Sequence, residues 1–145
     1  MSSGRGYGWV PDITRIDLSR YRLQKAKEML ASAKRDMEAE DYASANNRAY
    51  YAIFHAMRAV LALDGEDYKK HSAVIARFTL NYLKPEILPR EYSKLISNAS
   101  LIRNRSDYED FYICSVADTN VLFSGAGSFC AEVEKYLTGR YGADA

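Results

Sequence analysis

The sequence has few helix-stopping residues and lacks the features of a membrane protein. Only three prolines occur in 145 residues, and no apolar run approaches the ~20 residues that a membrane-spanning helix needs. The first segment, MSSGRGYGWVP, has no apolar signal-peptide core. A formal net charge of +1 argues against a protein whose affinity depends on a large basic field, as in non-specific DNA binding. These absences predict a cytoplasmic protein that does not insert into a membrane.

Cysteine and the common metal and nucleotide motifs are also scarce. Cys114 and Cys130 lie in helical patterns without CxxC spacing, so we expect reduced core thiols. No Gly-rich phosphate loop, HExxH or GxSxG motif occurs, and no Glu-x-x-His pattern suggests a di-metal site. We therefore expect no metal and no cofactor.

Apolar residues make up 48 % of the chain and recur at helical spacing, which predicts an all-α protein. Residues 1–16 are expected to form a flexible N-terminal arm whose Trp9 and Val10 dock on the body. Residues 17–140 are expected to form one antiparallel bundle of four or five helices. The expected helices cover residues 19–40, 41–63, 71–83, 90–105 and 115–137.

Local signals predict the helix ends and the buried faces. Asp17 or Ser19 is expected to cap the first helix and Asp41 the second, which Asp64-Gly65 closes. The expected inward stripe of the last helix is Val116, Asn120, Phe123, Gly127, Cys130 and Leu137. The run Gly125, Ala126 and Gly127 in that helix predicts close contact with another helix.

The second helix is apolar on two faces, which predicts a place in the middle of the bundle. Its alanine row and the glycines of the last helix are the expected surfaces of a homodimer. The Ala/Tyr rhythm of residues 41–59 also fits one tetratricopeptide-type repeat. Such arrays need three or more copies, and no second copy occurs.

One stripe of the second helix is polar and cationic. Arg48, Tyr51, His55 and Arg58 follow at spacings of three and four residues and therefore share a face. Because buried cations need partners, we expect acidic ones among Asp107, Glu109 and Asp110. The stripe fits a groove that binds phosphate and stacks a base, and it equally fits a satisfied polar layer that fixes helix register.

A second cationic group surrounds the start of the third helix. His71 follows Lys69-Lys70, and a helix N-terminus beside two lysines favours an anion. The alternative is that His71 only orders the loop by hydrogen bonding to the end of the fourth helix, at Asp107. Within that helix, Arg103 and Asp107 are spaced to form an ion pair.

Three blocks resemble the HEPN domain family, in particular its prokaryotic branch labelled UPF0332. They read NNRAYYAIFHAMRAVLALDG, KKHSAVIARF and LIRNRSDYED, and the resemblance covers residues 18–138. It implies a helical bundle that pairs as a homodimer and is encoded beside a small nucleotidyltransferase. It also implies a toxin–antitoxin module in which the HEPN protein is a metal-independent ribonuclease, and in which the partner attaches AMP to a tyrosine comparable to Tyr108.

The sequence departs from the family's ribonuclease motif, which is Arg, four to six residues, then His. The block begins with Arg103-Asn104, but Asp107, Tyr108, Glu109 and Asp110 stand where the histidine is expected. If catalysis occurs, the candidates are His55, His71 and Arg103. The full candidate cluster is Arg48, Tyr51, His55, Lys70, His71, Arg103, Asn104, Asp107 and Tyr108.

The missing histidine leaves three hypotheses for the function. The favoured one is a binding and assembly module that recognises a nucleotide or RNA and pairs with a nucleotidyltransferase. The alternatives are a metal-independent ribonuclease toxin and a structural helical homodimer without a ligand.

Overall fold

The computed structural model describes residues 10–110 and 112–144, and every regular element in these ranges is helical. The elements are α1 (Val10–Glu38), α2 (Tyr42–Leu63), α3 (His71–Phe78), a π-helical continuation η1 (Thr79–Leu83), α4 (Tyr92–Tyr108) and α5 (Val116–Asp144). The all-α prediction is confirmed. Within the described ranges, no helix has the length and apolar character needed to cross a membrane.

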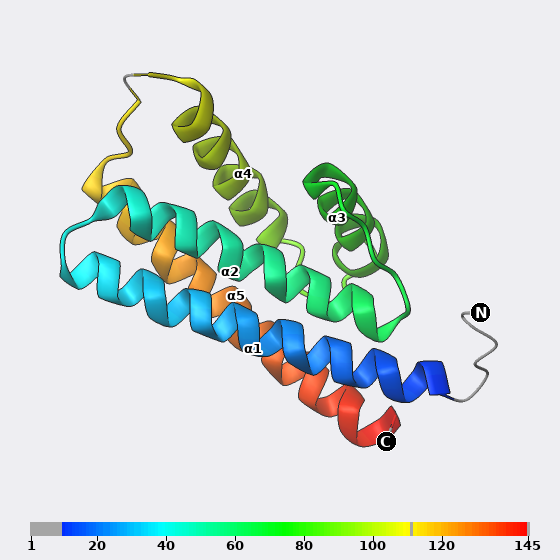
Figure 1. Cartoon of the computed structure of the whole chain (residues 1–145). Coiled ribbons are helices and arrows are strands. Elements are labelled where there is room, and N and C mark those ends of the chain that lie inside the picture. The colour runs from blue at the N-terminus through cyan, green and yellow to red at the C-terminus, as the bar shows by residue number, and fades with distance from the viewer. Residues whose placement is uncertain (1–9, 111, 145) are drawn as a thin grey trace.

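α2 lies in the middle of the bundle, as its two apolar faces predicted. α1 and α2 form an antiparallel hairpin that packs on α5, while α3 and α4 lie on the other side of α2 (Figure 1). Asp41 caps α2 by accepting a hydrogen bond from the backbone N–H of Ser44. The helix ends at Leu63 with Asp64 as its C-cap, and Gly65 follows with a positive φ of 79°, which glycine adopts without strain.

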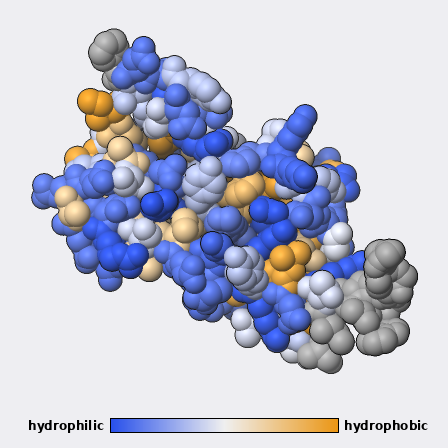
Figure 2. All heavy atoms as spheres, viewed as in Figure 1, coloured by the Kyte–Doolittle hydropathy of each residue, from blue (hydrophilic) through white to orange (hydrophobic). Residues whose placement is uncertain are grey.

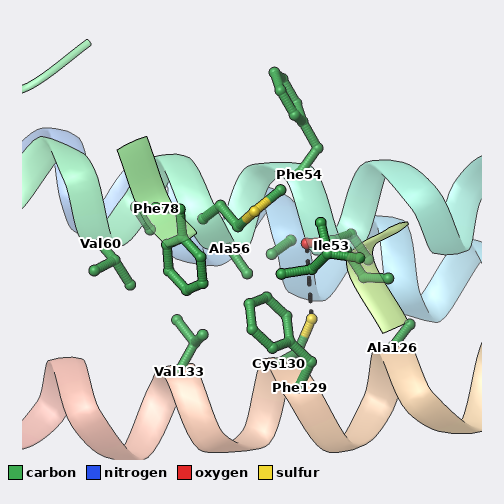
Figure 3. Packing of buried hydrophobic residues seen from close by; sticks show 14 of the residues in the cluster. Ile53, Phe54, Ala56, Val60, Phe78, Ala126, Phe129, Cys130 and Val133 are labelled. Carbon is green, nitrogen blue, oxygen red and sulfur yellow. Dashed lines mark hydrogen bonds between the residues drawn. The ribbon is translucent and has the colours of Figure 1, made fainter. Parts of the chain in front are cut away.

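The core fills the space between α2, α3 and α5. Phe78 and Phe129 are fully buried and meet edge to face, and the Cys130 thiol donates to the Ala52 carbonyl (Figure 3). The alanine row of α2 is buried within this one chain, so this half of the predicted homodimer surface is not free for a second copy. Cys130 and Cys114 are free thiols, although Cys114 lies in the irregular segment before α5 and not in a helix.

The first helix begins earlier than the sequence predicted. α1 starts at Val10, with Pro11 in its first turn, where a missing backbone N–H costs nothing. Residues 10–16 of the expected arm are therefore helical, whereas residues 1–9 lie outside the described residues. The predicted docking contacts of Trp9 and of the Val10 side chain also lie outside them. Asp17 and Ser19 are inside the helix, and neither begins it.

Ser19 has a different role from the predicted cap. Its hydroxyl is buried, donates to the carbonyl of Ala59 at 2.7 Å and lies 2.7 Å from Tyr141 Oη. The serine therefore joins α1 to α2 and α5.

The register of α5 also differs from the prediction. Val116 is 49 % exposed and Asn120 is exposed, although Cys130 and Leu137 are buried as predicted. The buried stripe comprises Thr119, Leu122, Ala126, Phe129, Cys130, Val133, Leu137 and Tyr141. The expected close helix contact is present at Gly125, where an added Cβ would lie 2.5 Å from Leu95 Cδ1. It is not present at Gly127, where a Cβ would have no neighbour within 4 Å.

Candidate functional site

A cluster of rings joins the start of α3 to α2. The His71 ring stacks on Phe54, with centroids 4.1 Å apart, and meets Tyr51 edge-on at 5.9 Å. His71 Nδ1 lies 2.7 Å from Tyr50 Oη. Phe54 belongs to the buried hydrophobic cluster but points away from α5, so the ring cluster lies on the face of α2 turned away from that helix (Figure 3). Figure 2 shows a mostly hydrophilic surface here, with apolar atoms visible between α3 and α4.

Arg103 of α4 lies against this cluster. Its guanidinium carbon is 5.2 Å from the centre of the Tyr50 ring and 5.8 Å from that of Tyr51, within the range of cation–π attraction. The predicted pair with Asp107 is present at 3.7 Å, Nε to Oδ2, and the Arg103 side chain is 27 % exposed. Since a guanidinium carries five N–H donors, this pair leaves donors for an anionic ligand.

The surroundings hold His71 and Tyr50 in their neutral forms at neutral pH. Burial lowers the pKa of His71, and the positive charges of Arg103 and Arg58 lower it further. Burial raises the pKa of Tyr50, and this outweighs the opposing effect of Arg103. With the Tyr50 hydroxyl as donor, His71 Nδ1 accepts and Nε2 carries the ring proton. The predicted hydrogen bond from His71 to Asp107 is replaced by this one.

A second polar network continues the site toward α1. Arg58 Nη2 and Arg22 Nη2 lie 2.8 and 3.2 Å from the two carboxylate oxygens of Asp67. Burial alone would raise the pKa of Asp67, but the hydrogen bonds from both arginines hold that pKa below its usual value. The predicted acidic partners are therefore wrong for Arg58, and Glu109 pairs instead with Arg105.

His55 sits beside this network and joins the ring cluster through Tyr51, at 6.1 Å between centroids. Burial, followed by the charges of Arg58, Lys25 and Arg22, lowers the pKa of His55 to about 4. An unfolded chain would titrate this group near pH 6.5. Between these two pH values the unfolded chain binds a proton that the folded chain does not, so lowering the pH destabilises the fold.

We therefore expect wild-type protein to lose more unfolding free energy between pH 7 and pH 4.5 than His55→Gln, because glutamine cannot titrate. Urea denaturation at both pH values measures the two losses. Equal losses in the two proteins would show that the His55 pKa is the same in the folded and unfolded chains, which would contradict the lowered pKa.

Several of the sequence-predicted residues come together, and others do not. Tyr51, His55, His71, Arg103 and Asp107 lie in or beside the ring cluster. The others are exposed to solvent, and they are Arg48, Lys70, Asn104 and Tyr108, the last with 83 % exposure. The predicted stripe of α2 is thus a half-buried layer whose first member, Arg48, is exposed.

Sequence reasoning missed a pocket between α2 and α4. Its volume is about 170 Å³, and it is lined by Ala43, Asn46, Asn47, Ile102, Arg103, Ser106 and Asp107. Asn46 is only 5 % exposed, and its Oδ1 has no hydrogen-bond partner among the described residues. An unsatisfied buried acceptor costs about 1–3 kcal/mol. A signal existed, because Asn46 shares a stripe with the buried apolar positions 50, 53 and 57.

The fold and these residues place the chain in a known family. The HEPN domain matches residues 19–136, and the chain therefore belongs to the HEPN domain family. It is similar to a "UPF0332 protein" of Thermotoga maritima, 29 % identical over 117 residues that cover 81 % of this chain and 89 % of the relative. It is also similar to "Putative toxin MJ0605" of Methanocaldococcus jannaschii, 35 % identical over 86 residues, or 59 % of this chain and 64 % of the relative. "UPF0332 protein PH1297" of Pyrococcus horikoshii is 37 % identical over 73 residues, or 50 % and 51 % of the two chains. The resemblance drawn from the three sequence blocks is confirmed.

Proposed function

We propose that this HEPN protein binds the phosphate of a nucleotide or RNA at Arg103 without cleaving it, and acts as the partner of a nucleotidyltransferase. The observation that carries the proposal is the position of Arg103, which lies over the Tyr50 and Tyr51 rings beside neutral His71. A guanidinium supplies paired donors to a phosphate, and the half-buried Tyr51 ring, unlike the 2 % exposed Tyr50 ring, supplies a face on which a base can stack.

The protonation states favour binding over cleavage. Metal-free RNA cleavage needs a base for the 2′-hydroxyl and an acid for the leaving oxygen. The pKa values of His55 and His71 are both lowered, so neither imidazole carries the second proton at neutral pH. The two candidate histidines thus supply two bases and no acid.

The alternative is a metal-independent ribonuclease toxin, and two observations favour it. His71 and Arg103 lie in the same cluster, as a base and a charge-stabilising group would, and two relatives carry the words "Putative toxin" in their names.

An RNA assay in buffer with a metal chelator distinguishes the two functions. Fluorescein-labelled single-stranded RNA is titrated with protein while anisotropy reports binding, and a denaturing gel then reports its length. We expect binding with full-length RNA. Fragments made by folded wild type, and lost in both His71→Ala and Arg103→Ala, would establish the ribonuclease. An absence of both binding and cleavage would refute RNA as the ligand in either function.

The role as a transferase partner is supported by Tyr108. This tyrosine is 83 % exposed in the last turn of α4, within reach of a modifying enzyme, and the family resemblance implies that a tyrosine in a comparable place accepts AMP. Mass analysis of the peptide that carries Tyr108, taken from protein made in its own host, should show the adduct. An unmodified peptide would contradict this part of the proposal.

A further inference from the structure

A second cationic group lies at the other end of the ring cluster from Arg103. Arg103 lies over the Tyr51 ring, near the middle of α2. The guanidinium carbon of Arg58 lies 5.8 Å from the centre of the Phe54 ring, nearer the end of that helix. Tyr51 and Arg58 are seven residues apart, which at 1.5 Å per residue is about 10 Å along the helix axis. After burial, both guanidiniums lower the pKa of His71, so the field of each reaches that ring.

The group around Arg58 carries more positive than negative charge. Arg58 and Arg22 share the single carboxylate of Asp67, at 2.8 and 3.2 Å, so one carboxylate faces two guanidiniums. Lys25 adds an ammonium and forms no ion pair with any residue in the ranges 10–110 and 112–144. After burial, the charges of Arg58, Lys25 and Arg22 have the largest effects on the pKa of His55, and all three lower it. The local field is therefore positive.

The side chains that would meet a ligand here are partly exposed. The side chain of Arg58 is 24 % exposed and that of Arg103 is 27 % exposed. Lys25 and the rings of Tyr51 and His55 are half-buried. These residues come from α1, α2 and α4, and α2 runs between the other two helices (Figure 1). A ligand lying along α2 can therefore touch both cationic groups and the rings between them.

We propose that Lys25 and Arg58 form a second phosphate site, and that the ligand is a single RNA strand whose backbone runs from Arg103 to this site. This inference rests on the proposed function and names its ligand as an oligonucleotide. The phosphates of a stacked strand follow one another at about 3.4 Å along its axis, so the ~10 Å along α2 corresponds to about three nucleotide steps. A mononucleotide has one phosphate position and cannot occupy both sites. The Tyr51 and His55 rings between the sites suit bases of any sequence, because every base has a face that can stack.

Calorimetric titration with uridine 5′-monophosphate and with a uridine hexanucleotide tests the proposal. We expect wild type to bind the hexanucleotide at least about thirtyfold more tightly, because a second phosphate contact adds to the statistical advantage of the longer strand. Lys25→Gln should lower this ratio by about threefold to fivefold, the contribution of a charge that is open to solvent. Arg58→Gln should lower the ratio at least as much.

Lys34 provides the matched control on the same helix as Lys25. It is exposed and lies nine residues further along α1, which at 3.6 residues per turn is the opposite face of the helix. Lys34→Gln removes the same charge and should keep the wild-type ratio. Where the mononucleotide binds too weakly to titrate, the hexanucleotide affinities of the two lysine variants give the same comparison.

The outcomes separate this inference from the function on which it rests. If Lys25→Gln and Lys34→Gln keep the wild-type ratio, or lower it equally, the second site is overturned while phosphate binding at Arg103 stands. Failure of both probes to bind wild type overturns the proposed function itself. Arg58→Gln breaks the ion pair with Asp67 and can unfold the chain, whereas Lys25→Gln breaks none, so circular dichroism of the lysine variant keeps the test intact.

Discussion

Replacing Arg103 by alanine is expected to weaken RNA binding by roughly 10- to 100-fold, the equivalent of ~1.5–3 kcal/mol for hydrogen bonds to a charged group. Its guanidinium lies over two tyrosine rings and is paired only loosely, at 3.7 Å, with Asp107. Arg103→Lys should recover part of the affinity, because lysine keeps the charge but lacks the planar fork. Anisotropy with labelled RNA measures all three proteins.

Arg105 provides a matched control two residues further along α4. It is bound to Glu109 through two hydrogen bonds, at 3.2 and 3.4 Å, and it lies over Tyr112, away from the ring cluster. Arg105→Ala removes the same charge from the same helix and is expected to change the affinity less than about twofold, as exposed ion pairs contribute little. If both alanine variants bind RNA equally weakly, the attraction is a general charge effect and Arg103 has no special place.

Replacing Phe129 by alanine is expected to cost about 3–5 kcal/mol of unfolding free energy, the usual range for deleting a buried phenylalanine. Phe129 is fully buried and meets Phe78 of α3 and Tyr92 of α4, with centroids 5.7 and 5.1 Å apart. The same deletion would therefore also loosen α3, which carries His71, and α4, which carries Arg103. Urea denaturation followed by circular dichroism measures the loss.

Phe123→Ala is the control for the register of α5. The sequence predicted Phe123 to point inward, but in the structure it is only half-buried. Its replacement should cost clearly less than that of Phe129. A larger loss at Phe123 would mean that the sequence-based register was right and the described packing wrong.

The contrast between α2 and α5 shows what the sequence could predict of the fold. α2 has a capping aspartate, a closing Asp64-Gly65 and apolar residues on two faces, so its limits and its central place follow from local signals. α5 offers two competing stripes, one through Val116 and Phe123 and one through Leu122 and Phe129. Contacts with the neighbouring helices decide which stripe is buried. The sequence pattern of a single helix holds no information about those contacts. The start of α1 was missed because Pro11 was taken for a loop residue, although proline suits a first helical turn.

The site was predictable where the residues share a helix and unpredictable where they do not. Arg103 and Asp107 are an i,i+4 pair, and Tyr51 and His55 share a stripe, so both pairs follow from spacing. Asp67 was not singled out because it lies in a polar loop, and its pairing with Arg22 and Arg58 depends on how that loop returns to α1 and α2. The homodimer and the transferase partner stay predictions.

The candidate site takes its residues from helices that are anchored to different degrees. Tyr50 and Asn46 belong to α2, which packs against α1, α3, α4 and α5, whereas Arg103 and Asp107 lie in the last two turns of α4, where residues 104–108 are all exposed. Amide hydrogens of α2 should therefore exchange with solvent only when the whole domain opens, and those at the end of α4 should exchange through local fraying. A ligand that bridges the two helices binds the ordered form of α4 alone, so its occupancy slows exchange at that end. The affinity of the site then depends on how often one helix terminus is folded.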